Sequence, residues 1–354
     1  MVLIKWIAKL IGGSLVLFIV YIGGIILLGN IFDYQPNEIE EISKQTATPS
    51  TTDTTKSFSL LNWNIGYCGL GAEMDFFYDG GNKVKTPANL VNKYSKGITD
   101  FLRSNDTIDF ILLQEVDKSA ARSSFLNELE LIEASLPDFI SEFAINYKSF
   151  FVPVPIFNPM GKVTSGIVSL SKNIPIISVR HNYHSSYPWP KKLFMLDRCF
   201  LVNKYQLPNG KDLVIINTHN SAFDAGGKLR EIEMLQIRDY MLEEFSHGNY
   251  VIAGGDWNQN PPGFKPENFG EKYIGHKIIS MNETLFPKQW EFAFGSVYPT
   301  NRNLDIAWDI QKTKTTIIDF FIVSPNIIIE SIQTVNLNFD FSDHEPIILK
   351  FRID

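Results

Sequence analysis

Five short polar segments, each containing an acid, an amide or a histidine, occur beside apolar stretches of this chain. They lie at residues 62–64 (Asn-Trp-Asn), 114–115 (Gln-Glu), 218–219 (Thr-His), 255–258 (Gly-Asp-Trp-Asn) and 342–344 (Ser-Asp-His). A polar side chain at the end of a buried strand needs a hydrogen-bond partner, a metal ion or a catalytic role. Together, the five segments predict one acidic, metal-binding pocket.

The apolar stretches have the length and composition of buried strands. Strands are predicted at residues 58–63, 110–113, 213–216, 250–253 and 317–323. Apolar residues at helical spacing predict covering helices at 92–103, 119–136 and 228–245. Helices alternate with strands early in the chain, whereas the C-terminal third has the pattern of strands and loops.

Cleavage of a phosphate ester needs a cation to neutralise developing charge, a positioned water and a proton donor for the leaving oxygen. Glu115 directly follows a predicted strand and is the best candidate for a carboxylate ligand of magnesium or manganese. Asn64 would bind the metal or a phosphate oxygen. The alternatives are a helix N-cap for Glu115 and a turn residue for Asn64.

The acid and base candidates lie in the last two polar segments. Asp256 would align or deprotonate the attacking water, and Asn258, two residues on, would hold a phosphoryl oxygen. His344 is the strongest histidine candidate because a neighbouring carboxylate would favour its charged form, and Asp319 is the expected partner. Taken singly, each has an ordinary alternative, such as a surface turn or a strand cap.

In this order the segments resemble the endonuclease/exonuclease/phosphatase superfamily, which includes DNase I, exonuclease III, neutral sphingomyelinases and inositol polyphosphate 5-phosphatases. The resemblance covers roughly residues 57–354 and extends to a glycine-led strand at 165–172 and a catalytic strand at 318–324. It implies an α+β fold in which two mixed β-sheets pack face to face with helices outside, a four-layer α/β sandwich. It also implies that Asp343 is a second metal carboxylate.

His219 separates branches of that family. DNase I and sphingomyelinase relatives have histidine at this point, whereas exonuclease III relatives have tyrosine, so the resemblance favours a phosphodiesterase in which His219 stabilises or protonates the phosphate. A buried histidine bonded to the backbone is the alternative. Ile167 stands where nucleases of the family often have asparagine, and aromatic stretches at 69–92 and 181–198 should border the pocket or simply pack as loops.

The charge of the chain disfavours tight binding of long nucleic acid. The chain has 32 basic and 39 acidic residues, of which four and five lie in the first 56. The remaining domain therefore has 28 basic and 34 acidic residues, a net charge near −6. Such binding draws most of its affinity from lysine and arginine, and no basic run is present. Nucleic acid remains a possible substrate, but a lipid headgroup or other small phosphate ester is favoured. No obligate protein partner is inferred.

The N-terminus is predicted to anchor the chain. Residues 7–28 are apolar enough to cross a membrane, which divides the chain into an anchor at 1–32, a flexible polar linker at 33–56 and a catalytic domain at 57–354. Lysines before the span and acids after it predict a cytoplasmic N-terminus and an extracytoplasmic domain. A cleaved secretory signal is the alternative. The two cysteines are expected to be free thiols.

These observations predict a membrane-anchored, Mg²⁺-dependent phosphoesterase. An extracytoplasmic endonuclease or exonuclease is the second hypothesis, and plasmid cleavage by the domain would distinguish it. A third hypothesis, a catalytically inactive binding module, is disfavoured because the acids and the terminal histidine are all present.

Overall fold

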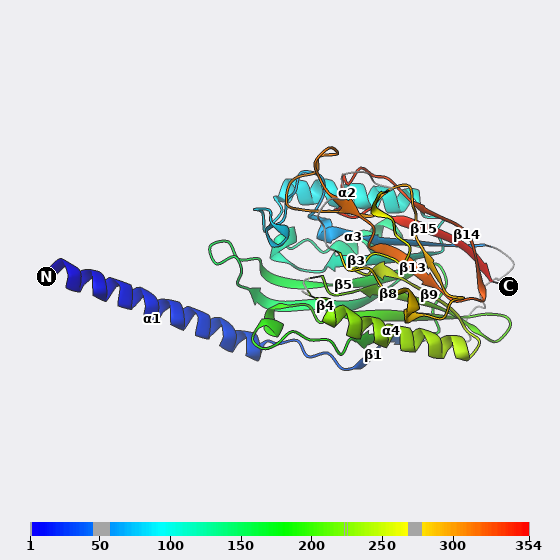
Figure 1. Ribbon diagram of the computed structural model, residues 1–354, viewed down its shortest axis with the longest axis horizontal. Helices are drawn as coiled ribbons and strands as arrows, with labels where there is room; N and C mark the ends of the chain where they lie inside the picture. Colours follow the sequence, from blue (N-terminus) through cyan, green and yellow to red (C-terminus); the bar gives the residue numbers. More distant parts are fainter. Residues whose placement is uncertain (1, 45–56, 223, 225, 268–277, 354) are drawn as a thin grey trace.

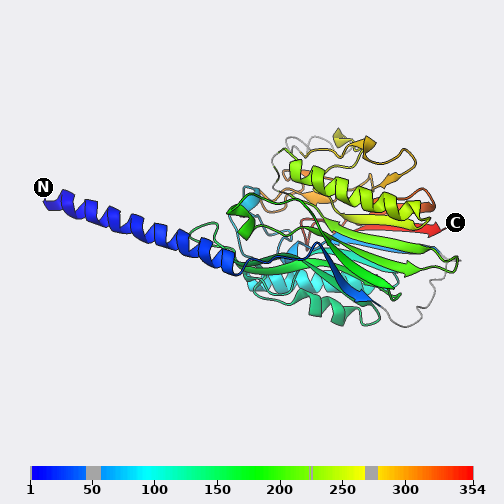
Figure 2. The ribbon, with the colours of Figure 1, turned by 90° about the horizontal axis from the view of Figure 1, so that it is seen from below.

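The domain consists of two β-sheets that pack face to face, with helices on both outer surfaces (Figures 1 and 2). The computed structural model describes residues 2–44, 57–222, 224, 226–267 and 278–353. Both sheets are mixed, since each contains one parallel pair of strands among antiparallel ones. The predicted α+β four-layer architecture is confirmed.

Within the described ranges, the first sheet has six strands. Their order is β14 (Ile327–Thr334), β15 (Ile347–Ile353), β2 (Phe58–Asn64), β3 (Phe110–Asp117), β5 (Gly161–Ser171) and β4 (Ile140–Val152). Strands β2 and β3 are parallel, and α2 (Ala88–Ser104) and α3 (Glu128–Ser135) cover the outer face.

The second sheet has seven strands among the residues described. Their order is β1 (Ile39–Lys44), β6 (Ile177–Asn182), β7 (Cys199–Gln206), β8 (Asp212–His219), β9 (Tyr250–Asp256), β13 (Asp319–Val323) and β10 (Glu291–Ala293). Strands β8 and β9 are parallel, and α4 (Lys228–Ser246) covers the outer face. Two short strands, β11 (Asn301–Arg302) and β12 (Thr315–Thr316), pair separately.

The central strands are buried on both faces, which explains their continuous apolar sequences. In β2, Leu61 and Trp63 pack in the cluster beneath α2, whereas Leu60 points to the other sheet and packs with residues such as Ile215 and Ile252. Successive side chains of a strand point to opposite faces, so one apolar run contributes to two cores. The predicted strands at 58–63, 110–113, 213–216 and 250–253 are therefore confirmed.

The sequence expectation of a helix over 119–136 is wrong for its first half. Only α3 is helical there beyond the short turn Ala121–Ser123. Ser124 and Phe125 have φ values of 56° and 60°, which end any right-handed helix. The helices expected at 92–103 and 228–245 correspond to α2 and α4, each slightly longer than expected.

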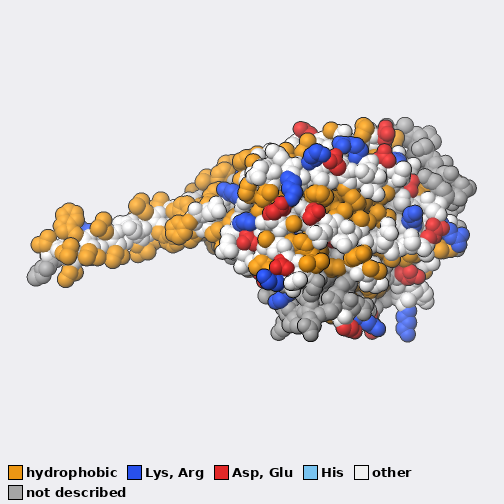
Figure 3. Space-filling view, turned by 90° about the horizontal axis from the view of Figure 1, so that it is seen from above, with side chains coloured by type: hydrophobic (Ala, Val, Ile, Leu, Met, Phe, Trp, Pro, Cys, Tyr) orange, Lys and Arg blue, Asp and Glu red, His pale blue; other side chains and the backbone are white. Residues whose placement is uncertain are grey.

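The N-terminal helix α1 (Val2–Ile31) extends away from the domain and is covered with hydrophobic side chains (Figure 3). By its length and apolar composition this helix could cross a membrane. A signal sequence would have the same properties.

Part of the expected linker is not a linker. Residues 39–44 form β1, which pairs antiparallel with β6 at the edge of the second sheet. An unpaired edge strand offers free backbone groups, and β1 pairs with those of β6. Ile42 of β1 is partly buried against a core cluster of the domain. The rest of that expected linker, residues 45–56, lies outside the described residues. Cys68 and Cys199 are both free and buried, as expected.

Candidate active site

The strand ends that carry the polar segments meet at one edge of the two packed sheets. In the second sheet, Asp256 is the register partner of His219 on β8 and of Asp319 on β13. In the first sheet, Asn64 pairs with Gln114, directly before Glu115. Sequence segments more than 250 residues apart are thereby brought together, as predicted.

Close approach of β8 and β9 requires glycine at position 255. A Cβ atom there would lie 2.0 Å from the carbonyl oxygen of Thr218. The glycine before Asp256 therefore lets the two parallel strands place His219 and Asp256 side by side, with 3.4 Å between Nε2 and Oδ2.

A cavity of about 850 Å³ opens at this edge. Six of the eight residues proposed from the sequence line it: Glu115, His219, Asp256, Asn258, Asp343 and His344. The other two, Asn64 and Asp319, are buried and contact lining residues. All eight proposed residues therefore belong to one site.

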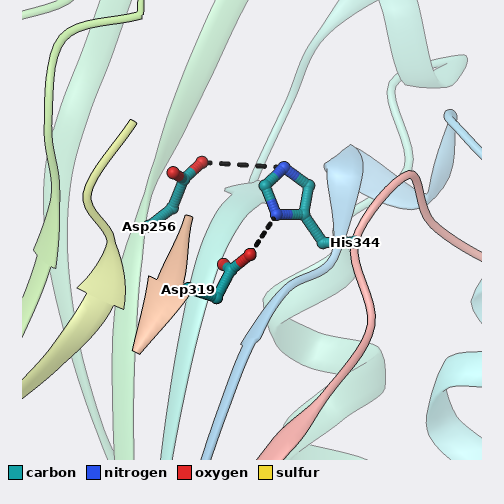
Figure 4. A group of neighbouring side chains, drawn as sticks. All are labelled: Asp256, Asp319 and His344. Atoms are coloured by element: carbon teal, nitrogen blue, oxygen red, sulfur yellow. Dashed lines mark hydrogen bonds and ion pairs between the residues drawn. The ribbon is translucent and has the colours of Figure 1, made fainter. Parts of the chain in front are cut away.

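His344 is held between carboxylates (Figure 4). Its Nδ1 lies 2.8 Å from Oδ2 of Asp319, and its Nε2 lies 3.6 Å from Oδ2 of Asp256 and 3.8 Å from Oδ2 of Asp343. Burial by itself would lower the pKa of His344, but Asp319, then Asp343 and Asp256, raise it well above the ordinary value. The imidazole is therefore charged near neutral pH, and Asp319 fixes its orientation.

Asp256 is a buried carboxylate with few donors. Its Oδ1 accepts from the backbone N–H of Asn258 at 2.9 Å, and its Oδ2 accepts from Nδ2 of Asn64 at 3.0 Å. Burial, opposed by His344 and reinforced by Asp319, raises the pKa of Asp256 to about 6. Asp256 is thus ionised at neutral pH while remaining basic enough to accept a proton from water.

Glu115 is aimed into the cavity by a bulge. The register of β3 against β5 shifts between Leu113 and Val116, and Glu115 has φ 56°. Bulges re-aim side chains in this way. Its carboxylate lies 3.8 Å from Nε2 of His219 and 3.8 Å from Nη1 of Arg122. The alternative that Glu115 caps a helix is wrong, because Asn127 is the N-cap of α3.

Asn64 joins the two halves of the site as a hydrogen-bond donor. Its Nδ2 reaches Asp256 at 3.0 Å and Glu115 at 3.4 Å, while its Oδ1 accepts from the N–H of Gly66 at 3.0 Å. A metal-ligand role would require the amide to turn so that its oxygen faces the cavity. That role for Asn64 therefore stays a prediction.

His219 and Asn258 complete the cavity wall. Burial, followed by the charges of Arg198 and His344, lowers the pKa of His219 well below its ordinary value, so the ring is neutral. Asn258 donates through Nδ2 to the carbonyl of Asn220 at 2.9 Å, which fixes its side chain. The two histidines of the site therefore carry different charges and suit different tasks.

Two residues of the site were missed by sequence reasoning. The amide nitrogen of Asn301 lies 3.0 Å from Nε2 of His344, and Arg122 lines the cavity while pairing with Asp117 through two hydrogen bonds of 2.9 and 3.1 Å. Neither follows a long apolar strand, so strand-end polarity gave no signal. A protonated His344 donates from Nε2 and needs an acceptor there. If the Asn301 amide is turned by 180°, its oxygen faces Nε2 and accepts this hydrogen bond.

The donor chemistry fits a hard divalent cation. Glu115 and Asp343 line the same cavity, and burial, opposed by His344 and reinforced by Glu115, raises the pKa of Asp343 to about 6. A cation bound between these carboxylates would offset that repulsion. A second group, Asp256, Asp319 and His344, also has ligand atoms within 4.8 Å of one another, but Asp319 and Nδ1 of His344 are already hydrogen-bonded to each other.

The fold and this constellation place the chain in a known class. Residues 61–344 match the model of the Endonuclease/Exonuclease/phosphatase family. The chain belongs to this family, whose members are metal-dependent hydrolases of phosphate esters.

Individual relatives are distant. A UPF0294 protein of Vibrio campbellii (strain ATCC BAA-1116) is 29% identical over 130 residues, a stretch that spans 37% of this chain and 43% of that protein. An endonuclease/exonuclease/phosphatase of Bacteroides vulgatus has a similar fold, with a TM-score of 0.53 and 14% identity over 85% of this chain and 100% of its own. The human Nocturnin catalytic domain also has a similar fold, with a TM-score of 0.51 and 15% sequence identity. The match covers 84% of this chain and 95% of the Nocturnin chain.

Proposed function

We propose that this protein is a membrane-anchored, Mg²⁺-dependent phosphoesterase that acts on a phospholipid or another small phosphate ester. The observation that carries the proposal is the pairing of Asp256, ionised and weakly basic, with His344, charged and fixed by Asp319, across one cavity. A base and an acid held 3.6 Å apart supply both proton transfers that ester hydrolysis needs.

The residues divide the work according to charge. Asp256 holds the attacking water and accepts its proton, while His344 neutralises charge on the phosphoryl group and protonates the leaving oxygen. Asn258 and neutral His219 bind phosphoryl oxygens without adding charge. A Mg²⁺ ion held by Glu115 and Asp343, with Asn64 as a further ligand after its amide turns, would supply electrostatic stabilisation of the transferring phosphoryl group.

Replacement of Glu115 with glutamine is expected to raise the Mg²⁺ concentration for half-maximal activity about tenfold or more, because one anionic oxygen is lost from the ligand set. A metal titration of the hydrolysis rate measures this. The matched control is Glu130→Gln on the exposed surface of α3. An unchanged titration would remove Glu115 from the metal site.

Activity should depend on pH through Asp256. Only its ionised form accepts a proton, so kcat/KM should rise with pH through a midpoint no higher than about 6, the raised pKa of Asp256. A bound cation favours the ionised carboxylate and moves the midpoint down. At higher pH the rate should stay level until His344 loses its proton. A pH–rate profile at saturating Mg²⁺ measures this, and a midpoint above 7 would contradict it.

Membrane anchoring by α1 is the second part of the proposal. The helix is apolar over a length that exceeds the ~20 residues needed to cross a hydrocarbon core. Lys5 and Lys9 near its start favour a cytoplasmic N-terminus by the positive-inside tendency. The domain would then lie on the opposite side of the membrane.

The experiment that tests the function is a substrate panel with the full chain and Mg²⁺. It compares sphingomyelin, glycerophospholipids, inositol phosphates, a generic phosphodiester and nucleic acid, with the Asp256→Asn variant as the blank. Hydrolysis of a lipid or small ester is expected. Cleavage of plasmid DNA alone would replace the substrate proposal by a nuclease, and no hydrolysis of any ester would overturn it.

A further inference from the structure

One end of the domain exposes apolar side chains on the loop that joins β4 to β5. Val154, Ile156 and Phe157 are 44%, 51% and 101% exposed, and Phe150 at the end of β4 is 46% exposed. Figure 1 shows this hairpin projecting from the end of the domain where α1 leaves. Soluble proteins rarely expose several large apolar side chains on one loop unless the loop binds another molecule or a membrane.

The same hairpin forms part of the rim of the catalytic cavity. Val152, Pro153 and Val154 line the cavity, and the hydroxyl of Tyr78, another lining residue, donates to the carbonyl of Val154 at 2.7 Å. The opening to the active site is therefore bordered by the exposed apolar loop.

The cavity rim is also packed against the C-terminal end of α1. The ring of Phe194, which lines the cavity, comes within 3.4 Å of where a Cβ of Gly29 would lie, and Nε1 of Trp189 donates to Oδ1 of Asn30 at 3.4 Å. Phe32 stacks on Phe150 with ring centroids 4.9 Å apart. These contacts fix the direction in which the apolar helix leaves relative to the active-site opening.

The hairpin reaches back along the apolar helix. A groove of about 350 Å³ is lined by Phe150 and Phe151 of β4 and by residues of α1 from Val20 to Leu28. At a rise of 1.5 Å per residue, Val20 lies about 16 Å along the axis from the end of α1 at Ile31. A bilayer that receives α1 up to its end would therefore also meet the hairpin.

Exposed lysines lie near the base of the hairpin and on the neighbouring short helix. Lys148 and Lys162 are exposed on β4 and β5 near the base of the hairpin, and Lys191 and Lys192 are exposed on the short helix Lys191–Phe194 at the cavity rim. Apolar groups at the tip of the hairpin, with lysines nearer the domain, match the order of hydrocarbon and phosphate in an anionic bilayer surface.

We infer that the β4–β5 hairpin, together with exposed Trp189 at the end of α1, docks into the bilayer that holds α1, so that the catalytic cavity opens onto the headgroup layer. The occupant of this surface is a phospholipid bilayer. The inference rests on the proposed insertion of α1 and deepens the proposed function, because a cavity in this position takes its phosphate ester from the membrane surface.

The test uses the full chain reconstituted in vesicles of phosphatidylcholine and phosphatidylglycerol. A polarity-sensitive fluorophore is attached to Phe157→Cys, and the matched control carries it at Pro208→Cys, in the exposed turn between β7 and β8 at the opposite end of the strands. Cys68 and Cys199 are buried, so labelling is selective. Lipids with a nitroxide near the headgroup are then added.

The fluorophore at position 157 is expected to shift to the blue and to be quenched about twofold or more by the nitroxide lipids, while the control stays unquenched. Adding Ile156→Asp to the position-157 protein should reduce the quenching. Equal responses at positions 157 and 208 would overturn the docking, leaving α1 as a simple tether. Quenching does not require catalysis. The proposed chemistry is therefore tested by a separate assay, the hydrolysis of soluble bis-p-nitrophenyl phosphate, and absence of that hydrolysis would leave the docking result unaffected.

Discussion

Replacement of Asp256 with asparagine is expected to lower kcat about a thousandfold, within the range that a general base contributes. The change removes the proton acceptor but keeps the size of the side chain. The amide oxygen can still accept from the N–H of Asn258, while its NH2 group replaces the oxygen that accepts from Asn64. Initial rates with a soluble phosphodiester at saturating Mg²⁺ measure the loss.

The fold should tolerate this substitution. Burial raises the pKa of Asp256 to about 6, which means that the folded state disfavours its charge at neutral pH. A neutral amide relieves that cost and so offsets the hydrogen bond lost from Asn64, and the melting temperature should change little. Asp239→Asn on the exposed face of α4 is the control. A rate within a few fold of the wild type would reject the role of Asp256 as the base.

Replacement of His344 with glutamine is expected to lower the rate about a thousandfold for an ester with an alkoxide leaving group. The charged imidazole is lost, and with it the proton for the leaving oxygen. For a p-nitrophenyl ester, whose leaving group needs little protonation, the loss should be much smaller. The rates of the two esters, compared in the variant and the wild type, separate proton donation from general disruption of the site.

Asp319→Asn tests how His344 is held. Asp319 touches the ring at Nδ1 rather than the cavity, so it is a positioning residue, and its amide variant should lower the apparent pKa of the alkaline limb of the pH–rate profile. An unchanged alkaline limb in Asp319→Asn would contradict the positioning role.

For His344→Gln, the control variant is His247→Gln, on the exposed C-cap of α4. Equal losses on both esters in His344→Gln would contradict an acid role.

Much of the site could be predicted because its residues stand at the ends of unusually apolar strands. Asp256 is the last residue of β9 and Glu115 lies near the end of β3, and both strands are largely buried. A charged side chain at such a point has few explanations besides function. Family resemblance supplied what spacing could not, including the place of Asp343.

The remainder depends on tertiary contacts that leave no local pattern. Asn301 reaches His344 from a strand of two residues, and Arg122 reaches the cavity through its pairing with Asp117. The strand at 39–44 has one isoleucine on each face, so its sequence does not alternate between apolar and polar residues. The helix expected at 119–136 is broken because Ser124 and Phe125 adopt left-handed backbone angles. Serine and phenylalanine rarely do so, and their presence in a sequence does not predict it.

The proposed metal site is tested directly by soaking a crystal of the protein with Mn²⁺ and locating the ion from anomalous scattering. We expect a peak in the catalytic cavity at about 2.2 Å from carboxylate oxygens of both Glu115 and Asp343. A peak between Asp319 and His344 instead, or no peak in the cavity at saturating Mn²⁺, would contradict it.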